Sequence, residues 1–172
     1  MRIIHCTQKL LKELGNPSLA DTPTDAKGLC NWYSNLIGID RKKCLLFTNE
    51  KTLYSFLIPN VKKANLKNIV PEFLFNLSFN LQAEGFGLDV ISKVMQEYRE
   101  IKFAKTDSKK VLGSMNQIAF EYEIRVQMKE GLGNVRILEA NKDMNRTLRS
   151  ILTGKEYFHP IEALQELIIN DF

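Results

Sequence analysis

Two clusters of basic residues are the feature of this 172-residue sequence whose types and spacing could do chemistry. Lysine and arginine side chains bind phosphate groups, so a basic surface can hold a nucleic-acid backbone. An aromatic side chain beside such a surface, for example Trp32 or Tyr33, could stack on a base. The clusters consist of Arg41, Lys42, Lys43, Lys62 and Lys63.

The charge distribution supports an anionic partner only modestly. The formal net charge is +4, with a net +6 over residues 1–113 and a net −2 over residues 114–172. A bias of this size can help an anionic partner approach, but it falls short of the composition of a dedicated nucleic-acid binder. The partner could therefore be nucleic acid or an acidic protein surface, and the alternative is a solvated surface that only aids solubility.

The sequence contains no established metal or phosphate-loop motif. Its two histidines, His5 and His159, are far apart, and neither Cys-x-x-Cys nor His-Glu-x-x-His spacing occurs. The most economical interpretation of His5 is a satisfied or half-exposed side chain in a strand. We therefore expect no metal and no cofactor.

A catalytic site is the competing hypothesis, and it would have to be assembled from distant residues. Ser114 follows a glycine but lacks the second glycine of a nucleophile elbow, so a packing role is the more economical interpretation. Cys6, Cys30 and Cys44 have the long, odd spacing of free thiols rather than of a disulfide framework. The polar candidates for an assembled site are Asn49, Ser114 and Asn116, together with Cys44 and Arg41.

A predicted β-hairpin would bring the two basic clusters together. The apolar runs at residues 43–49 and 52–58 are separated by a short polar turn, which favours a hairpin. Residues 41–43 precede the first run and residues 62–63 follow the second. Both clusters therefore lie at the base of the hairpin and would form one patch.

The remaining elements are predicted from periodicity. Strands are expected at residues 2–6 and 101–105, and a helix over residues 29–37 because Leu29, Trp32, Tyr33, Leu36 and Ile37 have helical spacing. Residues 118–128 fit a helix and a strand equally well, and we favour a helix because the run is long. Further helices are predicted at residues 8–14, 68–84, 88–99, 135–148 and 160–169.

These elements predict one α+β domain over residues 1–172, in which a small, mainly antiparallel sheet packs against several helices. No apolar run approaches the length needed to span a bilayer, so no membrane partner is expected. The N-terminus does not have the pattern of a signal peptide. Together with the cysteines, these features predict a cytoplasmic protein.

Three segments carry a family resemblance: HCTQKLLKEL at residues 5–14, NWYSNLIGIDRKKCLLFTNEKTLYSFLIP at 31–59 and VLGSMNQ at 111–117. In this order and spacing they resemble a family of uncharacterised prokaryotic proteins, described as a domain of unknown function. The resemblance extends over nearly the whole chain. It implies a small bacterial or archaeal cytoplasmic domain, and it implies no catalytic residues.

The leading hypothesis is a non-catalytic binding or regulatory module that uses the basic patch. The first alternative is the small enzyme described above. The second is a structural domain that forms a homodimer through the apolar C-terminal segment at residues 161–172.

Overall fold

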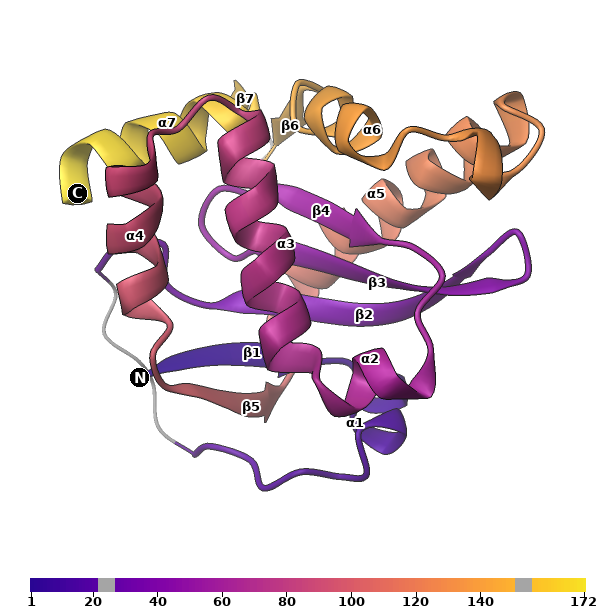
Figure 1. Ribbon diagram of the computed structural model, residues 1–172, viewed down its shortest axis with the longest axis horizontal. Helices are drawn as coiled ribbons and strands as arrows, with labels where there is room; N and C mark the ends of the chain where they lie inside the picture. The colour runs from indigo at the N-terminus through magenta and orange to yellow at the C-terminus, as the bar shows by residue number, and fades with distance from the viewer. Residues whose placement is uncertain (22–26, 151–155) are drawn as a thin grey trace.

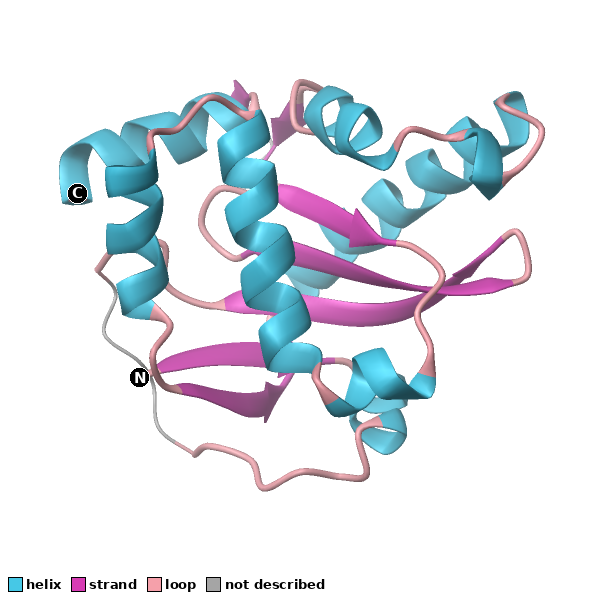
Figure 2. Ribbon diagram, viewed as in Figure 1, coloured by secondary structure: helices cyan, strands magenta, loops and turns pink. Residues whose placement is uncertain are grey.

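A five-stranded sheet forms the centre of the molecule (Figures 1 and 2). The computed structural model describes residues 1–21, 27–150 and 156–172. The spatial order of the strands is β4-β3-β2-β1-β5. Their bounds are β1 Arg2–Cys6, β2 Trp32–Ile39, β3 Lys42–Asn49, β4 Ser55–Ile58 and β5 Ile101–Lys105.

The sheet is mixed. β2 pairs antiparallel with β3, and β3 pairs antiparallel with β4. β1 pairs in parallel with both β2 and β5. Antiparallel pairing covers the longer part of the sheet, and the α+β fold class predicted from the sequence is confirmed.

Helices cover both faces of the sheet (Figure 1). On one face, α3, α4 and α7 enclose an aromatic core around Trp32 and Phe73. On the other face, α5 and α6 pack on β2, β3 and β4 through residues such as Tyr122 and Met144. The helices are α1 Gln8–Glu13, α2 Lys63–Lys67, α3 Ile69–Ala83, α4 Leu88–Glu97, α5 Lys109–Met128, α6 Ile137–Met144 and α7 Pro160–Asp171.

The helix predicted over residues 29–37 is wrong, because this segment contains strand β2. Trp32 and Leu36 face the aromatic core, whereas Tyr33 and Ile37 face the α5 side. A strand that is covered on both faces has no polar alternation, so its apolar residues can fall at helical spacing by coincidence.

Two further segments refine the sequence prediction. Residues 109–128 form the single helix α5, so the ambiguous run at 118–128 is helical as favoured. The helix predicted over 135–148 is shorter, since α6 ends at Met144 and is followed by the short strand β6 (Arg149–Ser150), which pairs with β7 (Tyr157–Phe158). Within the described residues, no helix is both long and apolar enough to cross a membrane.

The edge strand β4 is capped by a side chain of α6 and by that of Asn145, the C-cap of this helix, instead of a sixth strand. Asn145 accepts a hydrogen bond from the Ser55 nitrogen (2.7 Å) and donates one to the Ser55 oxygen (2.7 Å). Asn141 accepts from the Leu57 nitrogen (3.1 Å). The two amides thereby satisfy backbone groups that an exposed edge would offer to another chain.

Candidate functional sites

The two predicted basic clusters lie together at one end of the sheet, on the right in Figure 1. β3 begins where β4 ends, and the Val61 nitrogen donates a hydrogen bond to the Lys43 oxygen (2.7 Å). All five cationic side chains are exposed. We call this group the basic end; it consists of Arg41, Lys42, Lys43, Lys62 and Lys63.

A tight turn presents Arg41. Asp40 and Arg41 connect β2 to β3 with positive φ angles of 49° and 58°, which is the backbone of a type I′ hairpin turn. The Asp40 carboxylate accepts a hydrogen bond from the Leu132 nitrogen (3.0 Å), which ties the turn to the segment after α5. The turn therefore has a defined position even though its side chains are exposed.

Most cations of the basic end have no partner among the residues that the structure describes. Lys43 Nζ lies 3.2 Å from Glu13 Oε1, and both side chains are at least one-third exposed. Such a pair contributes about 0–1 kcal/mol, so it competes weakly with an external anion. Within the described part of the chain, the other four side chains of the basic end form no hydrogen bond or ion pair.

No aromatic platform accompanies the basic end. Trp32 and Tyr33 begin β2, whereas Arg41 lies two residues beyond its last residue, so roughly 25 Å of extended chain separates them. Both rings are almost completely buried, and Trp32 Nε1 donates to the Tyr98 hydroxyl (2.7 Å). The basic end can therefore contact phosphates, but these two rings do not stack on a base there.

The polar candidate Asn49 has a structural role. Its side-chain oxygen accepts hydrogen bonds from the nitrogens of Lys51 (3.1 Å) and Thr52 (3.0 Å), and its amide nitrogen donates to the Leu29 oxygen (2.6 Å). These bonds hold the turn between β3 and β4. The side chain is completely buried, so it does not face a cleft.

The other members of the assembled-enzyme hypothesis lie apart. Ser114 is half-buried and Asn116 is exposed, both on α5, whereas Asn49 pairs with Trp32 on the opposite face of the sheet. Cys44 is completely buried, and burial raises the pKa of its thiol, as it also raises the pKa of Cys6 to about 12. The structure therefore does not bring these residues into one site.

The C-terminal segment proposed for dimerisation supplies part of the core. Ile161, Leu164 and Ile168 of α7 are buried against the aromatic core, and Ile169 is the large apolar side chain of this helix that is strongly exposed. Most apolar side chains of the segment therefore pack against the core of the same chain and are not exposed to a second copy.

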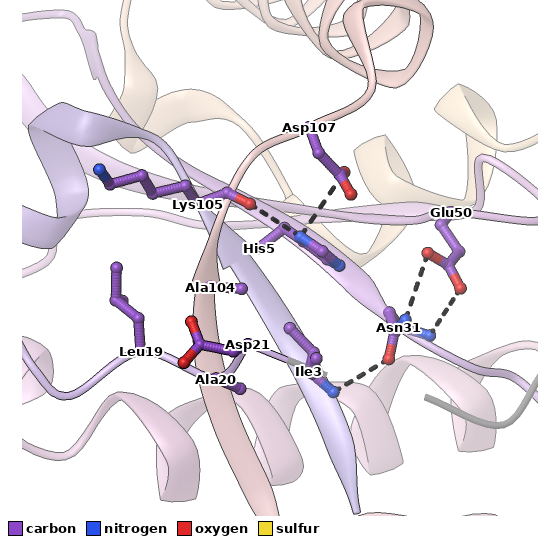
Figure 3. A pocket seen from close by; sticks show the side chains of 10 residues that line it. All are labelled: Ile3, His5, Leu19, Ala20, Asp21, Asn31, Glu50, Ala104, Lys105 and Asp107. Atoms are coloured by element: carbon purple, nitrogen blue, oxygen red, sulfur yellow. Dashed lines mark hydrogen bonds and ion pairs between the residues drawn. The ribbon is translucent and has the colours of Figure 1, made fainter. Parts of the chain in front are cut away.

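A cavity over β1 and β5 brings together residues that the sequence prediction did not combine (Figure 3). Its volume is about 560 Å³. Side chains alternate along β1, so Ile3 and His5 face away from the aromatic core that receives Ile4. The lining residues are Ile3, His5, Leu19, Ala20, Asp21, Asn31, Glu50, Ala104, Lys105 and Asp107.

His5 is held in one orientation at the floor of this cavity. Its Nδ1 atom lies 2.9 Å from the Lys105 backbone oxygen, and its ring stacks on Tyr33 with centroids 4.7 Å apart. A carbonyl oxygen only accepts hydrogen bonds, so this contact assigns a proton to Nδ1; in the neutral imidazole Nε2 is then the acceptor. The residue is 8% exposed, and no described residue donates to Nε2.

Asp107 connects His5 to Tyr33. Its Oδ1 atom lies 3.7 Å from His5 Nδ1 and accepts a hydrogen bond from the Tyr33 hydroxyl. Burial, followed by the neighbouring Asp107 carboxylate, raises the pKa of Tyr33, so the phenol keeps its proton and remains the donor. The Asp107 side chain is 72% exposed, which leaves its carboxylate accessible from the cavity.

Hydrogen bonds between Asn31 and Glu50 position another part of the cavity lining, beside His5. The Asn31 backbone nitrogen and side-chain amide donate to the two Glu50 oxygens at 3.2 and 3.4 Å, and Asn31 Oδ1 accepts from the Ile3 nitrogen (3.0 Å). These bonds fix a carboxylate of the β3–β4 turn beside β1 (Figure 3).

Sequence reasoning missed this cavity because it did not predict the parallel pairing of β1 with β5. That pairing places His5 opposite Ala104 and brings the Asp107 that follows β5 next to the imidazole. Two features of the sequence could have indicated this site: a histidine within the otherwise apolar strand predicted at residues 2–6, and an aspartate shortly after the strand predicted at residues 101–105.

A family model described as Domain of unknown function (DUF6933) matches residues 3–163. The chain belongs to this family. The family model carries no activity, in agreement with the resemblance noted from the three sequence segments. Neither the curated proteins nor the solved structures contain a match to the chain.

Proposed function

We propose that this protein is a non-catalytic binding module whose basic end holds the phosphate backbone of a nucleic acid. The observation that carries the proposal is the convergence of two separate cationic segments at one end of the sheet, where four of the five side chains have no partner among the described residues. Free, exposed cations are the groups that replace condensed counterions on a phosphate backbone.

The geometry supports binding that is independent of base sequence. Trp32 and Tyr33 are buried away from the basic end, so neither ring can stack on a nucleic-acid base there, although the sequence suggests such stacking. Contacts from lysine and arginine to phosphates position a protein on nucleic acid without reading its bases. We therefore propose similar affinity for duplexes of different sequence.

The proposed cellular setting is the cytoplasm of a prokaryote. The three cysteines are buried thiols that form no disulfide within the described residues, which fits a reducing compartment. The prokaryotic origin rests on the family resemblance of the sequence segments.

Fluorescence anisotropy with a labelled DNA duplex tests the proposal. If about four phosphates are contacted, the logarithm of the association constant falls with the logarithm of salt concentration with a slope of roughly −3 to −4. The variant Lys42→Glu/Lys62→Glu/Lys63→Glu should abolish binding, since it reverses three unpaired cations but leaves the Arg41 turn intact.

The matched control is Lys109→Glu/Lys110→Glu/Lys129→Glu, which changes the net charge equally at exposed positions in the first turn of α5 and at its C-cap, Lys129. We expect this control to keep most of the affinity. Wild-type protein without salt-dependent binding would overturn the proposal, as would equal loss in both variants. Binding of an acidic peptide in place of the duplex would reassign the basic end to an acidic protein partner.

A further inference from the structure

We propose that the cavity over β1 and β5 is a second site, which binds a small aliphatic amine in its ammonium form. This inference goes beyond nucleic-acid binding, since it concerns another part of the molecule and a ligand of opposite charge. It rests on the partly open cavity, the orientation of the buried His5 and the carboxylates that surround it.

The polar groups of the cavity are mainly hydrogen-bond acceptors. The Lys105 carbonyl accepts from Nδ1 of His5, so the neutral imidazole offers its Nε2 lone pair to a ligand. Carboxylates of Asp21, Glu50 and Asp107 lie around it (Figure 3). A carboxylate has about four lone-pair positions, so the bonds from Asn31 and Tyr33 leave acceptor capacity for a ligand.

The local charge favours a cation over an anion. Among the described residues that line the cavity, three carry carboxylates, whereas Lys105 is the one lysine or arginine. The Lys105 ammonium group extends away from His5, while its backbone oxygen faces the imidazole (Figure 3). An anionic ligand would meet like charges, and an ammonium group can donate to as many as three acceptors.

The apolar lining explains why the proposed ligand carries an aliphatic chain. Ile3 and Ala104 lie on the sheet face, and Leu19 and Ala20 form the wall beside β5, where the Ala20 nitrogen donates to the Phe103 oxygen (2.8 Å). The volume of about 560 Å³ falls within the range of small-molecule sites. A metal ion fits less well, because no group of three or more metal-binding side chains occurs in the described residues.

Calorimetry and NMR with diaminobutane test this site in the full chain, with butanediol as the uncharged analogue of the same length. We expect saturable binding of the diamine, a shift of the His5 imidazole resonances and no comparable response to the diol. Asp21→Asn and Glu50→Gln should each weaken binding about two- to fivefold. His5→Phe, which retains a ring for stacking on Tyr33, should weaken it about tenfold.

Glu100→Gln is the matched control, because this carboxylate is 61% exposed and does not line the cavity. It should bind the diamine like the wild type. Asp21 lies on an exposed loop, so Asp21→Asn remains informative if His5→Phe fails to fold. The proposal is overturned if the diol binds as tightly as the diamine, if neither binds, or if Asp21→Asn and Glu50→Gln retain wild-type affinity.

Discussion

The antiparallel and parallel halves of the sheet differ in how they are covered. In β3, every residue from Cys44 to Asn49 is buried between the aromatic core and the α5 side. In β5, Ala104 is the one fully buried residue, and the strand lies beside an open cavity. The comparison indicates that the antiparallel half provides most of the stability, while the parallel half leaves polar side chains accessible to a ligand.

The largest expected effect comes from the aromatic core. Phe73 is completely buried, with ring centroids 5.4 Å from Trp32, 5.1 Å from Phe47 and 5.5 Å from Tyr98. Phe73→Ala should lower the free energy of unfolding by about 3–5 kcal/mol, measured by urea denaturation. Phe75→Ala is the control on the same helix; this ring is 66% exposed, so its loss should cost roughly 0.5 kcal/mol or less. Similar losses in both variants would contradict the assignment of stability to the covered core.

Alkaline pH should also destabilise the protein through its buried tyrosines. Burial is the leading cause that raises the pKa of Tyr33, Tyr54, Tyr98 and Tyr122. The unfolded chain then loses these protons at lower pH than the folded chain. Their contribution is present below the ordinary tyrosine pKa of about 10 and is lost as pH rises above it, by about 1.4 kcal/mol per pH unit for each such tyrosine.

Urea denaturation between neutral and alkaline pH measures this loss. Tyr157→Phe is the control, because Tyr157 is 66% exposed. Its pH profile should follow that of the wild type. An unfolding free energy that stays constant above the ordinary tyrosine pKa would contradict the burial of the four phenols.

A smaller effect is expected at the capped edge of β4. Asn141 Oδ1 accepts from the Leu57 nitrogen (3.1 Å) and from the Tyr122 hydroxyl (2.6 Å), and both donors are buried. Asn141→Ala would leave them unsatisfied, so unfolding should become easier by about 1–3 kcal/mol. Asn116→Ala, at an exposed position of α5, should stay within roughly 0.5 kcal/mol of the wild type. If Asn141→Ala left the free energy of unfolding equally unchanged, water would have replaced the hydrogen bonds of the amide, and the predicted stabilisation by Asn141 would be wrong.

The smallest expected effect lies in the parallel half. Tyr33→Phe removes the hydroxyl that donates to Asp107 but keeps the ring that stacks on His5. Because Asp107 is largely exposed and can bond to water, the loss of stability should be about 1 kcal/mol or less. A loss as large as that of Phe73→Ala would show that the cavity wall, too, is a main source of stability.

The sequence predicted much of the fold because several elements had a clear local period. The hairpin at residues 43–58 and the helix around Phe73 follow from apolar runs and turn residues. The helix around Ile118 had no such clear period, and only the length of the run favoured it over a strand. β2 was missed because Trp32, Leu36 and their neighbours are buried on both faces, which removes the alternation that identifies a strand.

The candidate sites were predictable to different degrees. The basic end follows from local pairing, since a hairpin necessarily brings its two bases together. The cavity depends on the parallel pairing of β1 with β5, and these strands are separated by most of the first hundred residues. No local pattern specifies such a pairing, so the meeting of His5 with Asp107 could not be derived from either segment alone.

The most direct test of the nucleic-acid proposal is a titration of ¹⁵N-labelled protein with a DNA duplex at low salt, followed by amide chemical shifts. The predicted result is a set of shifts confined to the basic end, around residues 41–43 and 61–63, which disappears as salt is raised. The absence of any shift, or shifts centred on the cavity while the basic end stays unchanged, would contradict the assignment of phosphate binding to the basic end.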